Sequence, residues 1–157
     1  MLGQDGLLPA GRHQVTTDVF RQQFVDAFGG SSTRARLFTR WQRHREALSS
    51  VVPIQAQWID GSYVTDRLDP GDVDVVSLID GPTFDALAPA LQLMVSQLVS
   101  GSGTRAVWGI DSYLLPVYPG GHPLRPETVK GLTYWDNQWQ RVKGNNQLTK
   151  GYLEVGT

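Results

Sequence analysis

The stretch 58–76, WIDGSYVTDRLDPGDVDVV, constrains the fold of this chain more than any other part of it. Its apolar ends predict β-strands at about 53–59 and 72–79, separated by a turn-rich spacer. Alternate side chains of a strand point to the same face, so Asp72 and Asp74 should project together, with Cα atoms roughly 7 Å apart. Their carboxylates repel each other unless a cation lies between them, so the pattern indicates a cation at this strand.

The residue types around this pair suit magnesium and phosphate. Carboxylate oxygens are hard ligands of the kind that Mg²⁺ prefers. The Gly61-Ser62 turn brings flexible backbone and a hydroxyl to a place where phosphate oxygens could approach closely. The alternative interpretation is a surface hairpin whose aspartates are solvated and whose glycines only make turns.

The order of these residues resembles the signature of the nucleotidyltransferase superfamily, whose fold is that of DNA polymerase beta. The signature is a Gly-Ser turn, a short spacer and Asp-x-Asp on a strand, and this chain matches each position. Nearly the full chain is also similar to a bacterial and phage family of uncharacterised nucleotidyltransferase-like proteins. That similarity rests on the lead-in GLLPAGRH, a helix with Phe20, Phe24 and Phe28, an arginine-rich second helix, residues 58–65 and 69–74, and Lys150-Gly151.

The resemblance implies a chemistry and a set of site residues. Superfamily enzymes usually place a third carboxylate on a later strand, and Asp111 is the candidate, since it lies in an apolar run where an unpaired charge is costly. Together with Asp72 and Asp74 it would bind two Mg²⁺ ions roughly 4 Å apart for in-line displacement. Gly61 and Ser62 would bind the nucleotide. The implied reaction moves NMP from an NTP to a hydroxyl of RNA, protein or a small molecule. The alternative is an Asp111 that faces water at a sheet edge.

Two sets of cations could contact the phosphates of such a nucleotide. Lys150 stands where the similar family has a lysine-glycine pair near its C-terminus, and it could equally be a surface lysine. Arg40 belongs to an aligned stripe with Arg36 and Arg43 on the second predicted helix. That stripe could receive a triphosphate or a polyanionic acceptor, or it could be a solvated helix face.

Aromatic residues and a histidine complete the candidates. Tyr134, Trp135 and Trp139 could stack on a base, although aromatic side chains clustered in a tail usually dock that tail onto the core. His13 is a candidate general base, and the alternative is a structural or exposed histidine.

The resemblance also leaves open whether the chain turns over a substrate. Relatives in the superfamily include tRNA-modifying toxins, antitoxins that transfer nucleotides to a partner toxin, and second-messenger synthases. A chain of 157 residues does not accommodate the added helical domain of the larger enzymes. The second hypothesis is therefore a nucleotide-binding or protein-interaction module, such as an antitoxin-like or phage accessory protein, that keeps the fold without turnover.

Composition narrows the class of protein. A length of 157 residues, with 40% hydrophobic and 18% charged residues, predicts a single globular domain, 1–157. The chain has no cysteine, which excludes disulfides and thiolate metal sites, and its net charge of −1 argues against a globally basic nucleic-acid binder. No apolar run approaches the roughly 20 residues that span a bilayer, and no signal-peptide pattern opens the chain. We therefore expect a cytoplasmic protein without a membrane partner; the oligomeric state stays open.

The order of predicted elements gives the fold class. We expect helices at about 17–28, 33–49 and 83–99, and one or two strands within 104–118. The third helix should bury Leu87, Leu91, Met94, Val95 and Leu98. Residues 1–14 are expected to be an extended lead-in, and 119–157 a loop-rich tail packed on the core. With the two strands around the Asp-x-Asp motif, this order predicts an α+β fold with helices on one face of a small mixed sheet.

Overall fold

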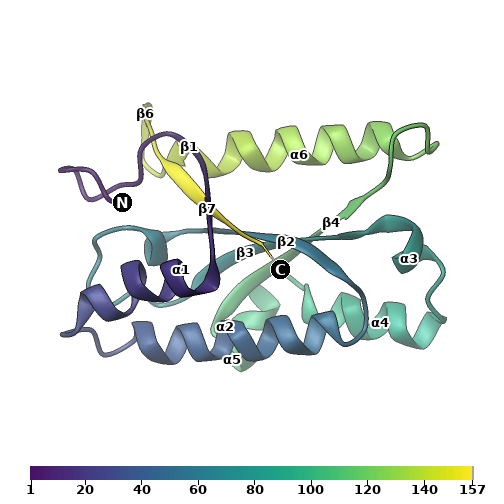
Figure 1. Ribbon diagram of the computed structural model, residues 1–157, viewed down its shortest axis with the longest axis horizontal. Helices are drawn as coiled ribbons and strands as arrows, with labels where there is room; N and C mark the ends of the chain where they lie inside the picture. Colours follow the sequence, from purple (N-terminus) through teal and green to yellow (C-terminus); the bar gives the residue numbers. More distant parts are fainter. Residues whose placement is uncertain (157) are drawn as a thin grey trace.

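The computed structural model describes residues 1–156, apart from the side chain of Asn146, and shows a mixed sheet with helices on both faces (Figure 1). The strands follow the order β1–β7–β2–β3–β4 across the sheet. The central strand β2 is antiparallel to β3 and β7, whereas the outer pairs, β1 with β7 and β3 with β4, are parallel. Their bounds are β1 (Gly11–Val15), β2 (Ile54–Asp60), β3 (Val73–Asp80), β4 (Ile110–Val117) and β7 (Gly151–Gly156).

Helices from the first two thirds of the chain cover one face of the sheet, and one long helix covers the other (Figure 1). The first layer consists of α1 (Thr17–Phe24), α2 (Arg34–Ser49), α4 (Pro89–Leu98) and the one-turn α5 (Arg105–Trp108). The opposite layer is α6 (Arg125–Trp139). The shorter elements are α3 (Gly81–Asp85), a two-stranded hairpin of β5 (Arg141–Val142) and β6 (Asn145–Thr149), and 3₁₀ turns at Asp26–Phe28, Ser62–Val64 and Ser102–Thr104.

Each face of the sheet has its own apolar core, because successive strand residues alternate between the two faces. Ile59 and Val75 face α1 and α2, where Phe20 and Trp41 pack against them. Trp58, two positions from Asp60 in β2, belongs to the α6 core. Its neighbours there include Val76, Leu115, Trp139 and Tyr152. The alternation therefore assigns Asp60, at the end of β2, and Asp74, at the start of β3, to the α6 face.

The segment 119–157 differs from the expected loop-rich tail, because it forms α6, β5, β6 and β7. Thr128, Leu132, Trp135 and Trp139 recur at intervals of four, three and four, which is the spacing of one helix face. Gly131 interrupts that pattern in the sequence but allows close packing, since a Cβ there would overlap the side chain of Leu115 in β4. The sheet is therefore covered on both faces, whereas the sequence predicted helices on one.

The lead-in also differs from expectation, whereas the segment 104–118 contains the expected strand, β4, after a helical turn that was not expected. Residues 11–15 of the expected lead-in form the edge strand β1. Strand β7 lies so close to this segment that a Cβ at Gly151 would overlap the carbonyl oxygen of Pro9. The single turn α5 precedes β4, and Gly109, with φ +69°, ends it. These short elements depend on partners distant in sequence, so local pattern alone does not predict them.

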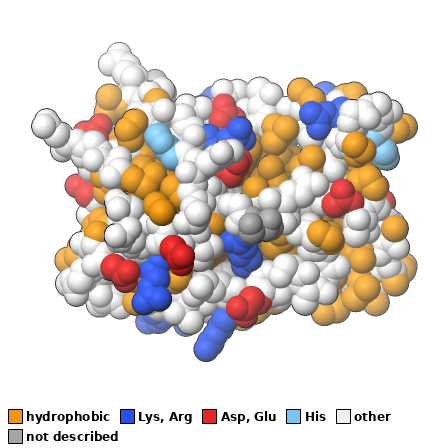
Figure 2. All heavy atoms as spheres, viewed as in Figure 1, with side chains coloured by type: hydrophobic (Ala, Val, Ile, Leu, Met, Phe, Trp, Pro, Cys, Tyr) orange, Lys and Arg blue, Asp and Glu red, His pale blue; other side chains and the backbone are white. Residues whose placement is uncertain are grey.

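The expected helix at 83–99 is divided into α3 and α4, because Pro89 cannot continue a helix. Within α4, Val95 is buried, whereas Leu91 and Met94, which were expected to be buried, are exposed. Figure 2 shows hydrophobic side chains gathered on the surface over this part of the fold. The helix packs at the end of the first helical layer, so only a narrow stripe of it contacts the core.

The predicted α+β class with a small mixed sheet is confirmed. Among the described residues, no helix combines the length and the apolar composition needed to cross a bilayer.

Candidate functional site

Four aspartates lie together on the α6 face, where β2 ends and where β3 and β4 begin. Asp74 is paired in register with Asp60 on β2 and with Asp111 on β4. Neighbouring strands lie about 4.8 Å apart, so the three residues form a row across the sheet. Asp72 precedes β3 and lines the same cleft as the other three. The structure therefore brings Asp72, Asp74 and Asp111 to one place, as the spacing predicts for the first two and the resemblance implies for Asp111, and adds Asp60.

The turn after β2 fits tightly against this row. Gly61 has φ +80°, a conformation that side-chain-bearing residues rarely adopt. A Cβ at this position would overlap the Oδ2 atom of Asp74 and lie 3.0 Å from its Cγ. Ser62 begins the short 3₁₀ turn that follows and lines the cleft beside Gly61. Glycine is thus required here both for its backbone angle and for the close approach of the Asp74 carboxylate.

A buried arginine fixes the loop between the turn and Asp72. Arg34, the first residue of α2, is 1% exposed, and its guanidinium donates to four backbone carbonyls at 2.5–2.9 Å. One carbonyl belongs to Phe24, and the others belong to Tyr63, Thr65 and Arg67 of the loop. The planar fork of arginine provides enough donors for this arrangement, which lysine does not. The sequence pattern did not identify Arg34, because nothing local distinguishes it from the exposed arginines of the same helix.

We expect Arg34→Lys to lower the free energy of unfolding by about 2–3 kcal/mol, because the ammonium group cannot satisfy all four buried carbonyls. Urea denaturation monitored by tryptophan fluorescence measures this loss. The matched control is Arg36→Lys on the exposed part of α2, which should change stability by less than about 0.5 kcal/mol. Equal effects of the two substitutions would contradict the anchoring role.

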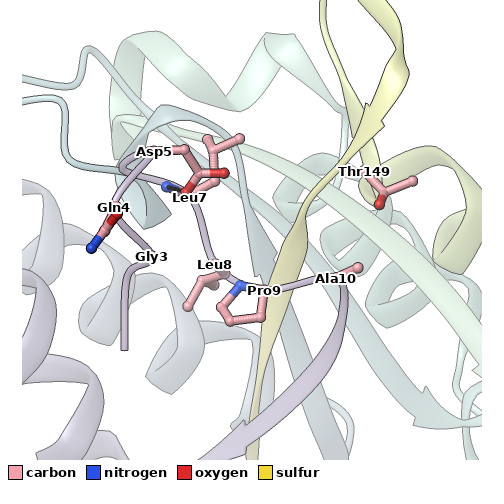
Figure 3. Close-up of a pocket in the computed structure, with 8 residues that line it drawn as sticks. All are labelled: Gly3, Gln4, Asp5, Leu7, Leu8, Pro9, Ala10 and Thr149. Carbon is pink, nitrogen blue, oxygen red and sulfur yellow. Dashed lines mark hydrogen bonds between the residues drawn. The ribbon is translucent and has the colours of Figure 1, made fainter.

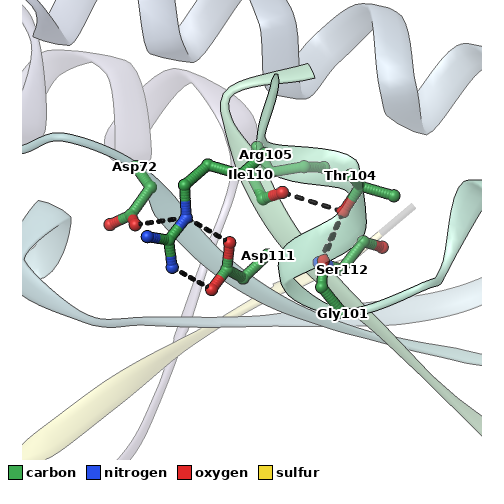
Figure 4. A network of polar contacts seen from close by, with 7 residues as sticks. All are labelled: Asp72, Gly101, Thr104, Arg105, Ile110, Asp111 and Ser112. Carbon is green, nitrogen blue, oxygen red and sulfur yellow. Dashed lines mark hydrogen bonds and ion pairs between the residues drawn. The ribbon is translucent and has the colours of Figure 1, made fainter. Parts of the chain in front are cut away.

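Two cations of the chain pair with the acidic row. Arg105 of α5 donates from Nε to Oδ1 of Asp111 at 2.7 Å and lies 3.0 Å from Oδ2 of Asp72, while its Nη2 contacts the second oxygen of Asp111 (Figure 4). Lys150, just before β7, contacts Asp60, and both side chains are almost fully buried. The positive charges therefore lie at Asp60, Asp72 and Asp111, on either side of Asp74.

The site perturbs the protonation of Asp74, the central carboxylate of the row. Its burial raises its pKa to about 7, and the neighbouring charges of Asp72, Asp60 and Asp111 act in the same direction. Arg105 opposes this effect without compensating it. A nearby positive charge would favour the ionised form of Asp74. The electrostatics of the row thus suit an additional cation.

The row forms the floor of an open cleft of about 840 Å³. Arg67 of the spacer loop, together with Arg141 and Lys143 of the β5–β6 hairpin, lines its rim, and all three are exposed. In the described part of the chain, none of the three forms an ion pair. An acidic floor beneath a basic rim can bind a complex of a cation with a polyanion, because each component meets the opposite charge.

Of three further residues predicted from sequence, Arg40 and His13 lie outside the cleft and Lys150 lines it. Arg40 does not line this cleft, because α2 covers the opposite face of the sheet, and its side chain packs near Gly109. His13 hydrogen-bonds through Nε2 to the carbonyl oxygen of Pro9 at 2.7 Å, within the lead-in. Lys150 does line the cleft but is already paired with Asp60.

The aromatic cluster of the predicted tail divides between two environments. Trp135 and Trp139 pack against the sheet in the α6 core, which confirms the docking interpretation for these two residues. Trp139 also reaches the edge of the cleft, whereas Tyr134 is exposed on α6. The cluster therefore serves mainly to hold α6 on the sheet.

A second hollow, of about 570 Å³, lies beside the lead-in and is lined by 3–5, 7–10 and Thr149 (Figure 3). The carboxylate of Asp5 accepts a hydrogen bond from the backbone N–H of Leu7 at 3.1 Å, so it stabilises its own turn. The remaining lining is backbone, apolar side chains and the uncharged polar side chains of Gln4 and Thr149. The hollow lacks the convergent charged groups that distinguish the acidic cleft.

The fit of a metal ion to the acidic row depends on Arg105. The described residues contain no group of three or more histidine, aspartate or glutamate side chains already arranged to bind a metal ion. Instead, the guanidinium lies between Asp72 and Asp111, where a cation would be placed (Figure 4). The hard oxygens on adjacent strands and the raised pKa of Asp74 suit a divalent cation. The carboxylates therefore fit such an ion once Arg105, whose side chain is 52% exposed, turns away.

Nearly the whole chain matches one known protein family. Residues 2–156 match the family described as "Family of unknown function (DUF6932)", and the chain belongs to this family. Comparisons with curated proteins and with solved structures gave no match. The matched region extends from the lead-in to β7, so the acidic cleft lies within the domain that defines the family.

Proposed function

We propose that this protein is a divalent-cation-dependent nucleotidyltransferase, which moves NMP from an NTP to a hydroxyl acceptor. The observation that carries this proposal is the row of Asp60, Asp74 and Asp111 on adjacent strands, with the Gly61 turn packed against Asp74. Displacement at phosphorus is catalysed mainly by positioning and by neutralisation of charge, and carboxylates that bind cations beside a phosphate-accepting turn supply both.

The proposed roles of the residues follow from their places in the cleft. Asp72, Asp74 and Asp111 would bind Mg²⁺, which when bound neutralises phosphate charge and lowers the pKa of an attacking hydroxyl. Gly61 and Ser62 offer backbone and hydroxyl groups to phosphate oxygens. Asp60 stays paired with Lys150, and this buried pair supports the floor of the cleft next to Asp74.

The basic rim supports a polyanionic substrate. Arg67 stands on one wall of the cleft, and Arg141 and Lys143 stand on the hairpin that follows α6. Exposed cations of this kind attract phosphate groups over several ångströms and donate hydrogen bonds on contact. A triphosphate bound along the rim would have its α-phosphorus above the acidic row. The acceptor hydroxyl would then lose its proton to water in the open cleft as its oxygen bonds to that phosphorus, and pyrophosphate would leave with the electrons of the broken P–O bond.

The experiment that tests this function is a transfer assay with NTPs labelled at the α-phosphate. We expect the label to reach an acceptor in total RNA or total protein in the presence of Mg²⁺, and to stay on the nucleotide when a chelator is present. NTPs labelled at the γ-phosphate provide the control, because nucleotidyl transfer leaves that label on pyrophosphate. Transfer of the γ-label would indicate a kinase, and transfer of neither label would argue against the proposed activity.

A second candidate is a nucleotide-binding or protein-interaction module without turnover. The specific observation in its favour is that Arg105 and Lys150 already form ion pairs with three of the four aspartates. A module of this kind would bind an NTP in calorimetry without transferring any label. Calorimetry with an NTP, together with the α-label transfer assay, therefore distinguishes the two candidates.

A further inference from the structure

We propose that Arg105 is an internal counter-ion that competes with the divalent cation for Asp72 and Asp111. This inference rests on the proposed function, because it assigns a role to a residue that the resemblance did not identify, at the same acidic row. Arg105 would pair with both carboxylates in the metal-free protein and give them up when the cation binds.

The contacts of Arg105 occupy the oxygens that a cation would need. Its Nε lies 2.7 Å from Oδ1 of Asp111 and 3.0 Å from Oδ2 of Asp72, and its Nη2 contacts Oδ2 of Asp111. Asp111 is 5% exposed, so it has little water to take the place of the guanidinium. The arginine thus holds both oxygens of one proposed ligand and one oxygen of another.

The turn that carries Arg105 is fixed by hydrogen bonds, whereas its side chain is about half exposed and is held by the two carboxylates. The hydroxyl of Thr104 lies 2.8 Å from the carbonyl oxygen of Ile110 and accepts from the backbone N–H of Ser112 at 3.1 Å (Figure 4). Gly101 and Ser112 are joined by backbone hydrogen bonds in both directions. Half of the Arg105 side chain is exposed, so its position depends on the two carboxylates rather than on packing.

Electrostatics explains why the cation and Arg105 exclude each other. A divalent ion at Asp74 would lie within a few ångströms of the guanidinium, since Asp74 is adjacent to Asp111 and two residues from Asp72. Like charges at that distance repel strongly where little water separates them. The ion brings twice the charge of the guanidinium to the same oxygens, so it displaces the side chain toward the open cleft. There Arg105 meets the space proposed for the phosphates.

The test compares metal binding by wild type and Arg105→Gln, with Mg²⁺ or Mn²⁺ alone and no nucleotide. If the paired conformation holds about nine molecules in ten, removing the competitor raises the affinity for the metal roughly tenfold. Calorimetric titration measures that change. Without metal, Arg105→Gln should unfold at a lower temperature than wild type, because Asp111 loses its partner. Saturating Mg²⁺ should raise the midpoint of the variant to at least that of metal-free wild type.

Two further variants keep the test specific. Arg67→Gln removes the same charge from the same cleft without touching a carboxylate, and it should raise metal affinity much less. Arg105→Lys keeps the charge but loses the two-pronged contact, so an intermediate affinity is expected, and it replaces the glutamine variant if that one does not fold. An affinity that is unchanged or lower in the Arg105 variants, or raised equally in Arg67→Gln, overturns the inference and leaves the proposed function standing. Absence of metal binding in every variant, including wild type, overturns both.

Discussion

Replacing Asp74 with asparagine is expected to reduce nucleotide transfer by about 10³-fold or more, while leaving the fold intact. The change removes a negative charge at nearly constant volume, so packing around the row should hardly respond. Metal affinity should fall steeply, because Mg²⁺ depends on anionic oxygen. Transfer of α-labelled nucleotide and titration with Mg²⁺ measure the two effects. If transfer were equal in wild type and variant, the catalytic groups would have to lie elsewhere.

The same substitution should change how stability depends on pH. The pKa of Asp74 is about 7 in the folded protein, above its ordinary value of 3.8, so the unfolded chain releases this proton first as pH rises. Asp74 therefore contributes a loss of stability to wild type between about pH 4 and pH 7, of roughly 2–4 kcal/mol. The amide introduced by Asp74→Asn does not titrate, so the metal-free variant should match wild type near pH 4 and exceed its stability above pH 7.

Urea denaturation across that pH range, with a chelator present, tests the expectation. Asp18→Asn is the control, because it makes the same chemical change in the exposed first turn of α1, where the loss of a carboxylate should cost no more than about 1 kcal/mol. If the free energy of unfolding of Asp74→Asn changed with pH as steeply as that of wild type, groups other than Asp74 would determine this pH dependence.

The sequence predicted those parts of the site that depend on local spacing. Asp72 and Asp74 are two residues apart on an apolar strand, so their common face follows from strand geometry. The same rule places Asp60 on the face of Trp58, two residues before it. Its place in the row depends on the register of β2 with β3, which a sequence pattern alone does not fix.

Residues whose contact with the site depends on how the elements assemble were predicted less well. Arg105 is six residues from Asp111, yet its contact depends on the one-turn helix α5 and on Gly109, which lead the chain back to β4. Arg40 was predicted to contact the nucleotide, but it does not line the cleft. The stripe on α2 indicates a helix face, but nothing in it tells which side of the sheet that helix covers.

The α6 helix was missed for a different reason. Its apolar residues are spaced correctly, but Gly131 and several polar residues dilute the pattern, and the preceding segment is rich in glycine and proline. Glycine in a helix normally indicates a weak element. Here it is explained by the side chain of Leu115, which occupies the space beside it, and that neighbour is known only once β4 and α6 are assembled.

Substitution of Gly61 by alanine is expected to be the most damaging single-methyl change in the candidate site. Alanine at φ +80° is strained by about 1–2 kcal/mol, and the added Cβ would overlap the Oδ2 atom of Asp74. We expect a total loss of about 3–4 kcal/mol in the free energy of unfolding, or a displaced Asp74 with loss of metal binding. Gly121→Ala isolates the backbone strain, because Gly121 has φ +82° and nothing within 4 Å of an added Cβ.

A double-substitution cycle separates the steric contribution from the strain. In Asp74→Ala, the carboxylate is gone and the remaining Cβ at 74 would lie 3.5 Å from the new methyl group, which is ordinary contact. Gly61→Ala should then cost no more in that background than Gly121→Ala costs in wild type, about 1–2 kcal/mol. The difference from its cost in wild type, about 2 kcal/mol, is the coupling between residues 61 and 74. If the two substitutions were additive, the Gly61-Ser62 turn would not be packed against the acidic row, and the structural link between the turn and the carboxylates would be lost.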